Sequence, residues 1–275
     1  MTQFPFDAED QWAEDGYIVL RGLLPLTRLA ELKQRIAARI IGDPVPNLAG
    51  DVDAAILNSF RRDTKCHQLS FYELGPSAFE IIFCQPVIAI ATRLLGAEVE
   101  LNPTQHVRVK LPTRLYQETV GRADPDVVPW HQDAFAKDPA PHLCDMVTFW
   151  VPLVSVHRVN GTIAVFPGSH REGPIKHDRT GIVCGLPAGR PRWITAEPGD
   201  VVVFHKHLVH GSTANDSLSL RWSIDFRVQA KGAFSGRDDA PNIPLPTEEP
   251  YCRTSLLLSW LAQQRAACGL LEGSK

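Results

Sequence analysis

The spacing of apolar residues changes once along the chain, near residue 98. Before that point, leucines and isoleucines recur every three or four positions and share one helical face that ends at Gly42: Leu26, Leu29, Leu32, Ile36 and Ile40. The segment QPVIAIATRLLG, residues 85–96, has Pro86 near its start and a glycine at its end, which is typical of a second helix. We therefore expect residues 1–97 to form a mainly helical part.

After residue 98 the apolar runs become short, and turn residues separate them. Six segments have the length and alternation of strands: 98–102, 105–111, 146–154, 162–169, 200–210 and 220–229. No helical segments alternate with these strands, which favours a mainly β fold, an antiparallel double-stranded β-helix (jelly roll) with flanking helices. We expect a single domain with its core at about 98–230, followed by a C-terminal loop and helix at 231–275, the helix itself at 254–271.

Two of the predicted strands alternate strictly between polar and apolar residues. In one strand the polar set is Arg221, Ser223, Asp225 and Arg227, and the apolar set is Trp222, Ile224, Phe226 and Val228. In the other the polar set is His106, Arg108 and Lys110, and the apolar set is Val107, Val109 and Leu111. The polar faces point either to solvent, as in most half-buried sheets, or into the jelly roll beneath a helical cover on the apolar side. Alternation alone leaves both arrangements open.

Composition and charge exclude several classes of protein. A formal net charge of -3 and a pI near 6.4 provide no basic field for nucleic acid, and no segment has the apolar length of a membrane span. The N-terminus lacks the features of a secretion signal, so we expect a cytoplasmic protein. The cysteines contain no Cys-x-x-Cys pair and are expected to be reduced: Cys66, Cys84, Cys144, Cys184, Cys252 and Cys268. The oligomeric state is not specified.

The segment WHQD places His131 and Asp133 two positions apart. In an extended chain, residues i and i+2 point to the same side, so this imidazole and this carboxylate could bind one metal ion. Three further histidines, His205, His207 and His210, follow an apolar strand. Any one of them would complete a set of two imidazoles and one carboxylate, the facial triad that suits Fe(II) oxygen chemistry.

Several longer motifs occur in order along the chain: WAEDGYIVLRGLLP, WHQD, NGTIAVFPGSH and HLVHGSTANDSLSLRWS. Together they resemble the phytanoyl-CoA dioxygenase family of Fe(II)- and 2-oxoglutarate-dependent oxygenases, over about residues 10–230. The resemblance implies that His131, Asp133 and His210 are the iron ligands. It also implies that Arg221 and Ser223 hold the distal carboxylate of 2-oxoglutarate, and that Lys110 or His106 makes another cosubstrate contact.

The activity that the resemblance implies is hydroxylation of an unactivated C–H bond in a small metabolite. Fe(II) would be the cofactor, 2-oxoglutarate and O₂ the cosubstrates, and succinate and CO₂ the by-products. Related halogenases replace the carboxylate ligand, whereas this chain retains Asp133, which favours hydroxylation; desaturation or ring closure stays open. The alternative is a non-catalytic jelly-roll metal protein, or a metal isomerase of similar fold, neither of which needs Arg221.

No motif selects the primary substrate. Residues 57–75 and 115–130 are rich in polar and aromatic side chains and could form lid elements over the site. Arg61, Arg62 and Arg227 could bind an anionic group, or could be ordinary solvated arginines.

Overall fold

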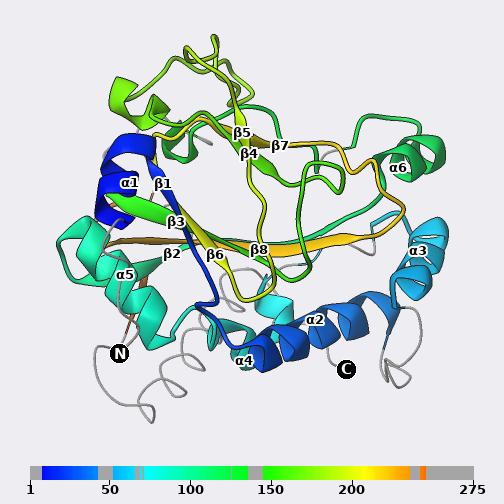
Figure 1. Cartoon of the computed structure of the whole chain (residues 1–275). Helices are drawn as coiled ribbons and strands as arrows, with labels where there is room; N and C mark the ends of the chain where they lie inside the picture. Colours follow the sequence, from blue (N-terminus) through cyan, green and yellow to red (C-terminus); the bar gives the residue numbers. More distant parts are fainter. Residues whose placement is uncertain are drawn as a thin grey trace.

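Two antiparallel sheets form the centre of the structure, a computed structural model that describes residues 8–42, 52–65, 69, 71–124, 126–135, 145–235 and 242–245. Helices cover the outer face of the larger sheet, and the smaller sheet lies against its inner face (Figure 1). This arrangement confirms the predicted jelly roll with flanking helices.

The larger sheet has the strand order β1-β6-β3-β8-β2-β9. Its strands are β1 (Tyr17–Leu20), β2 (Val99–Lys110), β3 (Met146–Pro152), β6 (Val201–His205), β8 (Arg221–Ala230) and β9 (Ile243–Pro244). The smaller sheet has the order β5-β4-β7, with β4 (Ile163–Val165), β5 (Arg192–Trp193) and β7 (His210–Ser212). The segment predicted as one strand over 200–210 is therefore split, and its two halves belong to different sheets.

Two features of the strands differ from the sequence-based expectation. The segments predicted as separate strands at 98–102 and 105–111 form one strand, β2, with a register shift between Leu101 and Gln105 where it pairs with β8. The N-terminal part is not entirely helical, because β1 pairs with β6 at the edge of the larger sheet. Only four residues long, β1 is too short for alternation to distinguish it from a loop.

The helices are α1 (Ala8–Asp15), α2 (Leu26–Ile41), α3 (Val52–Arg62), α4 (Pro76–Phe79), α5 (Gln85–Leu95) and α6 (Thr113–Val120). Both helices expected in the N-terminal part, α2 and α5, are present. Gly42 ends α2 with φ 98°, and Gly96 ends α5 in the left-handed conformation with φ 63°, so each glycine takes a backbone angle that other residues rarely adopt. Leu26, in the first turn of α2, is 61% exposed, whereas the other four residues of the predicted helical face are buried.

The structure decides which face of β8 points inward. Trp222, Ile224, Phe226 and Val228 belong to the main apolar core, together with the buried residues of α2 and α5. The polar residues of β8 are also buried, because the smaller sheet covers that side. Helices thus cover the apolar face, and the polar face lines the interior between the sheets.

Two expectations about segments outside the sheets are changed or left open. Residues 57–75 were a candidate lid, but Phe60, Phe71 and Leu74 pack into the helix-side core, on the opposite face of the larger sheet from its polar residues. The helix predicted at 254–271 lies outside the described residues. Among the described residues, Cys184 is an exposed free cysteine.

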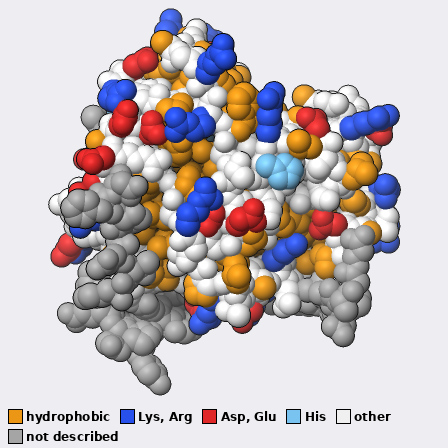
Figure 2. Space-filling model, in the orientation of Figure 1, with side chains coloured by type: hydrophobic (Ala, Val, Ile, Leu, Met, Phe, Trp, Pro, Cys, Tyr) orange, Lys and Arg blue, Asp and Glu red, His pale blue; other side chains and the backbone are white. Residues whose placement is uncertain are grey.

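The molecular surface mixes both signs of charge on the face drawn in Figure 2, where Lys and Arg side chains alternate with Asp and Glu. Within the described part of the chain, no helix is long and apolar enough to cross a lipid bilayer.

Candidate functional site

A backbone bridge brings His131 and His210 together. The amide of each residue donates to the carbonyl of the other, with N···O distances of 2.9 and 3.0 Å, so His131 extends the edge of the smaller sheet next to β7. The two imidazole rings lie 4.2 Å apart, centroid to centroid. This bridge selects His210, and not His205 or His207, as the histidine beside His131.

Asp133 reaches the same point by a different geometry from the one expected. The WHQD segment is not a regular strand: His131 forms the isolated bridge, and Asp133 begins a short 3-10 helix. The fully buried Gln132 fixes the bend, because its amide donates to the carbonyls of Gly173 (2.9 Å) and His207 (2.6 Å) and its oxygen accepts from the amide of Ile175 (2.9 Å). The two side chains therefore converge as the sequence predicted, but through a bridge and a 3-10 helix and not through a regular strand.

The three side chains form a cluster with the geometry of a metal site. Nε2 of His131 and Nε2 of His210 lie 3.6 and 3.8 Å from Oδ1 of Asp133. Within the described residues, this is the group of His, Cys, Asp and Glu side chains whose ligand atoms converge closely enough to hold an ion. The residue types and their number fit a divalent transition metal bound on one face.

The tautomers of both histidines favour metal binding. Nδ1 of His131 lies 2.8 Å from the carbonyl oxygen of Pro129, and Nδ1 of His210 lies 3.0 Å from that of Leu208. A carbonyl can only accept, so each Nδ1 carries the proton and each Nε2 presents its lone pair toward Asp133. Burial, followed by the neighbouring His131, lowers the pKa of His210 to about 4, which keeps its imidazole neutral at physiological pH.

Asp133 is held in place on both oxygens. Oγ1 of Thr148 donates to its Oδ2 at 2.5 Å, and Nη2 of Arg227 donates to its Oδ1 at 2.8 Å. Burial alone would raise the pKa of Asp133, but the charge of Arg227 and the neighbouring histidines lower it well below the ordinary value. The carboxylate is therefore ionised and oriented before any metal binds.

Arg221 lines the opposite end of the same pocket, whereas Ser223, its neighbour on the same side of β8, is not part of the lining. Both are buried, and Nη1 of Arg221 donates to Oγ of Ser223 at 2.5 Å, while its Nε donates to the carbonyl of Gly161 at 3.2 Å. No carboxylate of the described residues forms an ion pair with this guanidinium, and burial lowers the pKa of Arg221 to about 10. A buried cation without an anionic partner fits a site that receives a carboxylate ligand.

Lys110 and His106 lie next to the pocket but are not part of its lining. Nζ of the fully buried Lys110 donates to Oγ of Ser212 (3.0 Å) and to the carbonyl of Thr213; burial, then the charge of Arg221, lowers its pKa to about 7. Nδ1 of His106 lies 2.7 Å from Oδ1 of Asp225. Direct cosubstrate contact by either residue stays a prediction.

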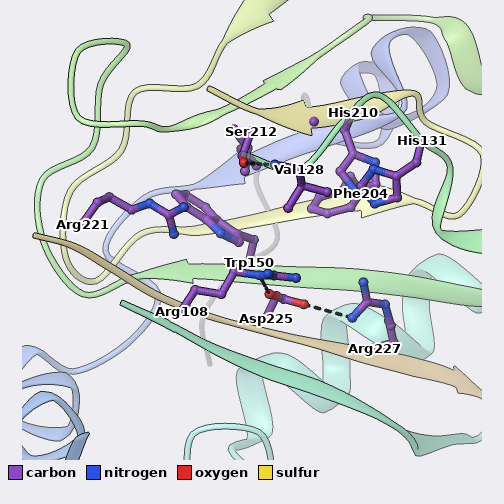
Figure 3. Close-up of a pocket in the computed structure, with 12 residues that line it drawn as sticks. Arg108, Val128, His131, Trp150, Phe204, His210, Ser212, Arg221, Asp225 and Arg227 are labelled. Atoms are coloured by element: carbon purple, nitrogen blue, oxygen red, sulfur yellow. Dashed lines mark hydrogen bonds and ion pairs between the residues drawn. The ribbon is translucent and has the colours of Figure 1, made fainter. Parts of the chain in front are cut away.

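The pocket between the sheets has an empty volume of about 430 Å³, which includes the open solvent at its mouth. In Figure 3 the two histidines lie at one end and Arg221 at the other, with Trp150 and Phe204 between them. The apolar lining consists of Val128, Trp150, Ile163 and Phe204, and the charged lining of Arg108, Arg221, Asp225 and Arg227.

Arg108, Asp225 and Arg227 were not assigned to the site from the sequence, although each lies on a polar strand face that also carries a predicted site residue. Arg227, for which the sequence left open an anion-binding role or an ordinary solvated position, is only 8% exposed. Arg61 and Arg62, by contrast, are exposed on α3. The alternation of β2 and β8 contained this signal, but it could be used only once the inward face was known.

A family model and curated relatives both match this chain over most of its length. The phytanoyl-CoA dioxygenase family model matches residues 12–223. The 1-deoxypentalenic acid 11-beta-hydroxylase of Streptomyces exfoliatus is 27% identical over 241 residues, covering 81% of this chain and 80% of that protein. The protein of the same name from Streptomyces arenae is 26% identical over 250 residues, with the same coverage of both chains.

Solved structures share the fold at lower sequence identity. The non-heme alpha ketoglutarate dependent carbocyclase SnoK from nogalamycin biosynthesis superposes with a TM-score of 0.62 at 20% identity, covering 90% of this chain and 95% of its own. EctD from S. alaskensis, solved with 2-oxoglutarate and 5-hydroxyectoine, gives a TM-score of 0.57 at 21% identity, covering 91% and 83%. With a family model that spans most of its length, the chain belongs to the phytanoyl-CoA dioxygenase family.

Proposed function

We propose that this protein is a dioxygenase that uses Fe(II), 2-oxoglutarate and O₂ to hydroxylate a C–H bond of a small molecule. One observation carries the proposal: a His-Asp-His cluster with both Nε2 atoms directed at a carboxylate shares a pocket with a buried arginine that has no anionic partner among the described residues. The first feature suits iron, the second suits a dicarboxylate, and the family membership agrees with both.

His131, Asp133 and His210 would hold the iron on one side and leave the positions facing the pocket open. Arg221 and Ser223 would hold the distal carboxylate of 2-oxoglutarate, with the planar guanidinium giving two parallel hydrogen bonds. When bound together, iron and 2-oxoglutarate supply the oxidising chemistry, in which O₂ provides the inserted oxygen and succinate and CO₂ are released.

The remaining residues of the site orient these groups. Thr148 and Arg227 fix the carboxylate of Asp133, and the carbonyls of Pro129 and Leu208 fix the two imidazoles. The polar side chains of β8 in the site are buried, which limits their own contact with bulk water. The chain thus contributes the position and orientation of the reacting groups.

Hydroxylation is the outcome that the ligand set and the relatives favour. Asp133 occupies the position that iron halogenases leave open, and the two Streptomyces relatives are named as hydroxylases. Structures with the same fold are also named as an epimerase and a carbocyclase, so the fold does not fix the outcome. A non-catalytic metal protein or a metal isomerase would have no use for an unpaired Arg221.

We treat the helical part, the jelly roll and the C-terminal segment as one oxygenase domain. The strand β1, which belongs to the N-terminal part, pairs with β6 at the edge of the larger sheet and so joins that part to the jelly roll.

The test is optical and needs no substrate. Anaerobic protein with Fe(II) and 2-oxoglutarate should show the visible charge-transfer band of the chelated cosubstrate. His131→Ala should abolish the band through loss of iron, and Arg221→Ala should shift its appearance to much higher 2-oxoglutarate concentration. Arg114→Ala is the matched control, because the Arg114 side chain is 90% exposed and, within the described part of the chain, its ion pair is with Glu118 on α6. Absence of the band from the unmodified protein would refute the proposal.

A further inference from the structure

The pocket holds three arginines, and Arg108 is the one that the proposed chemistry does not use. Its side chain is 25% exposed, compared with 10% for the side chain of Arg227, and Arg221 as a whole residue is only 1% exposed. Arg108 is therefore the most exposed of the three arginines. Figure 3 shows Arg108 and Arg227 extending into the pocket on either side of Asp225.

A chain of ion pairs connects Arg108 to the metal ligand. Nε of Arg108 donates to Oδ2 of Asp225 at 3.0 Å, and Nη1 of Arg227 donates to Oδ1 of Asp225 at 2.9 Å. The second terminal nitrogen of Arg227, Nη2, donates to Oδ1 of Asp133. Asp225 also accepts from His106, and the interactions with His106, Arg108 and Arg227 outweigh burial and lower the pKa of Asp225 far below the ordinary value. Asp225 is thus an ionised carboxylate whose charge is shared among several donors.

Arg108 keeps unused hydrogen-bond donors. Apart from Asp225, the nearest carboxylate that the structure describes is Asp126, whose Oδ1 lies 3.9 Å from Nη1, too far for a hydrogen bond. Asp126 is also outside the pocket lining. The terminal nitrogens of Arg108, each with two N–H groups, therefore make no hydrogen bond to the described residues.

Counting charges over the loaded site leaves one positive charge. Fe(II) would be balanced by Asp133 and by the carboxylate of 2-oxoglutarate that chelates it, and Arg221 by the distal carboxylate. Of the remaining charged groups in the lining, Asp225 balances one of the two arginines, Arg108 and Arg227. Within the lining one positive charge is therefore left over, which favours a monoanion; the nearest carboxylate beyond the lining is that of Asp126, which forms a longer ion pair with Arg108 at 3.9 Å.

We propose that Arg108 binds a carboxylate group of the primary substrate, so that the enzyme acts on small monocarboxylic acids. This inference rests on the proposed function and deepens it. The planar guanidinium can give a carboxylate two parallel hydrogen bonds through its terminal nitrogens while Nε stays on Asp225. One surplus charge matches a monoanion better than a phosphate dianion. Because Arg227 fixes both Asp225 and Asp133, Asp225 anchors Arg108 at a defined place relative to the metal ligand.

The experiment measures binding and not turnover. Protein carrying Zn(II) in place of iron, with saturating 2-oxoglutarate, is titrated by saturation-transfer NMR against linear, cyclic and aromatic monocarboxylic acids. Each acid is paired with its own primary amide, which has the same skeleton without the charge. The variants are Arg108→Gln, Arg108→Lys and the surface control Arg114→Gln, and 2-oxoglutarate affinity is measured in each.

In unmodified protein, at least one acid should bind ~10- to 100-fold more tightly than its amide, the range expected for a charge-assisted hydrogen bond. Arg108→Gln should lower that acid to the level of its amide, Arg108→Lys should retain part of the preference, and Arg114→Gln should retain all of it. The affinity for 2-oxoglutarate should change less than about threefold in every variant, well below the effect of losing a charge-assisted pair.

Three results would overturn the inference. The first is that acids bind no better than amides to the unmodified protein, including the case in which neither binds; this comparison needs no variant, so misfolding of Arg108→Gln cannot obscure it. The second is a full acid preference in folded Arg108→Gln. The third is a loss of 2-oxoglutarate binding in Arg108→Gln, which would make Arg108 a cosubstrate ligand. The optical band of Fe(II) and 2-oxoglutarate tests the proposed function separately, so either idea can fail alone.

Discussion

Replacing Arg221 should have opposite effects on cosubstrate binding and on the stability of the cosubstrate-free protein. The guanidinium is buried, it has no carboxylate partner among the described residues, and its contacts are Ser223 and the carbonyl of Gly161. Such a group is costly in the empty site and strongly favourable once a carboxylate arrives. Arg221→Met, which keeps an unbranched chain of similar length, isolates the charge.

The magnitudes follow from the burial of the group. Burial lowers the pKa of Arg221 from 12.5 to about 10, so at neutral pH, below both values, the penalty on the charged form is fully present. Each pKa unit corresponds to ~1.4 kcal/mol, which makes this penalty about 3 kcal/mol. The two hydrogen bonds that are lost with the side chain contribute about 1 kcal/mol each. Without the cosubstrate, the free energy of unfolding of Arg221→Met should therefore exceed that of the unmodified protein by about 1 kcal/mol.

Binding should change in the other direction. Removing one member of a buried charge pair costs about 2–4 kcal/mol, a roughly 30- to 1,000-fold weaker affinity for 2-oxoglutarate. At a concentration 100 times the dissociation constant, a ligand stabilises the folded state by about 2.7 kcal/mol. For a protein of this size that is a rise in Tm of about 5–10 °C. A variant with 100-fold weaker affinity would gain only ~0.4 kcal/mol, or about 1 °C.

The assay is thermal unfolding of anaerobic protein with Zn(II), with and without 2-oxoglutarate, alongside direct titration of the cosubstrate. Arg221→Lys should recover part of the 2-oxoglutarate response, because an ammonium keeps the charge but not the fork. An undiminished response in Arg221→Met would refute the assignment and transfer the role to Lys110. A large loss of stability in the cosubstrate-free variant would show that the guanidinium already has an anionic partner.

Three further predictions concern the metal ligands and the surrounding charges. His131→Ala should lose most of its bound iron, because two protein ligands hold Fe(II) poorly; metal analysis after desalting checks this, and near-normal iron content would contradict the assignment. Arg227→Met should destabilise the metal-free protein by ~3–5 kcal/mol, because Asp133 and Asp225 lose the positive charge that they share. Zn(II) should reduce this loss of stability, since the ion replaces the charge at Asp133. An equal loss of stability in denaturant titrations with and without Zn(II) would contradict the prediction. Burial lowers the pKa of His205 from 6.5 to about 4, so between these pH values the unfolded chain binds a proton that the folded protein does not bind. The free energy of unfolding should therefore fall as the pH drops through this window, and it should fall less steeply in His205→Gln. Identical slopes in the two proteins would argue against the lowered pKa of His205.

The helices α2 and α5 and most of the strands could be located from the sequence because local rules decide them. Periodicity gives the element type, and glycines mark where both helices end. The positions of Arg221 and Ser223 on one side of β8 also follow from the chain alone, since side chains in a strand repeat every two residues. The likeness of the ordered motifs to a family pointed to His131, Asp133 and His210 before any geometry was known.

Other features depended on contacts between distant parts of the chain. Alternation in β8 defines two faces but not what covers each, and only the packing of α2 and α5 against Trp222 and its apolar neighbours shows that the polar face points inward. That single fact moves Arg227 from a candidate surface residue to a partner of Asp133, and Arg108 into the pocket. Sequence spacing could not rank the histidines at 205, 207 and 210 either, because the choice is made by a backbone bridge between segments far apart in the chain. Local periodicity fixes the direction of a side chain relative to its own strand, whereas burial, charge pairing and metal geometry depend on which other segment lies opposite, and only the tertiary structure decides that.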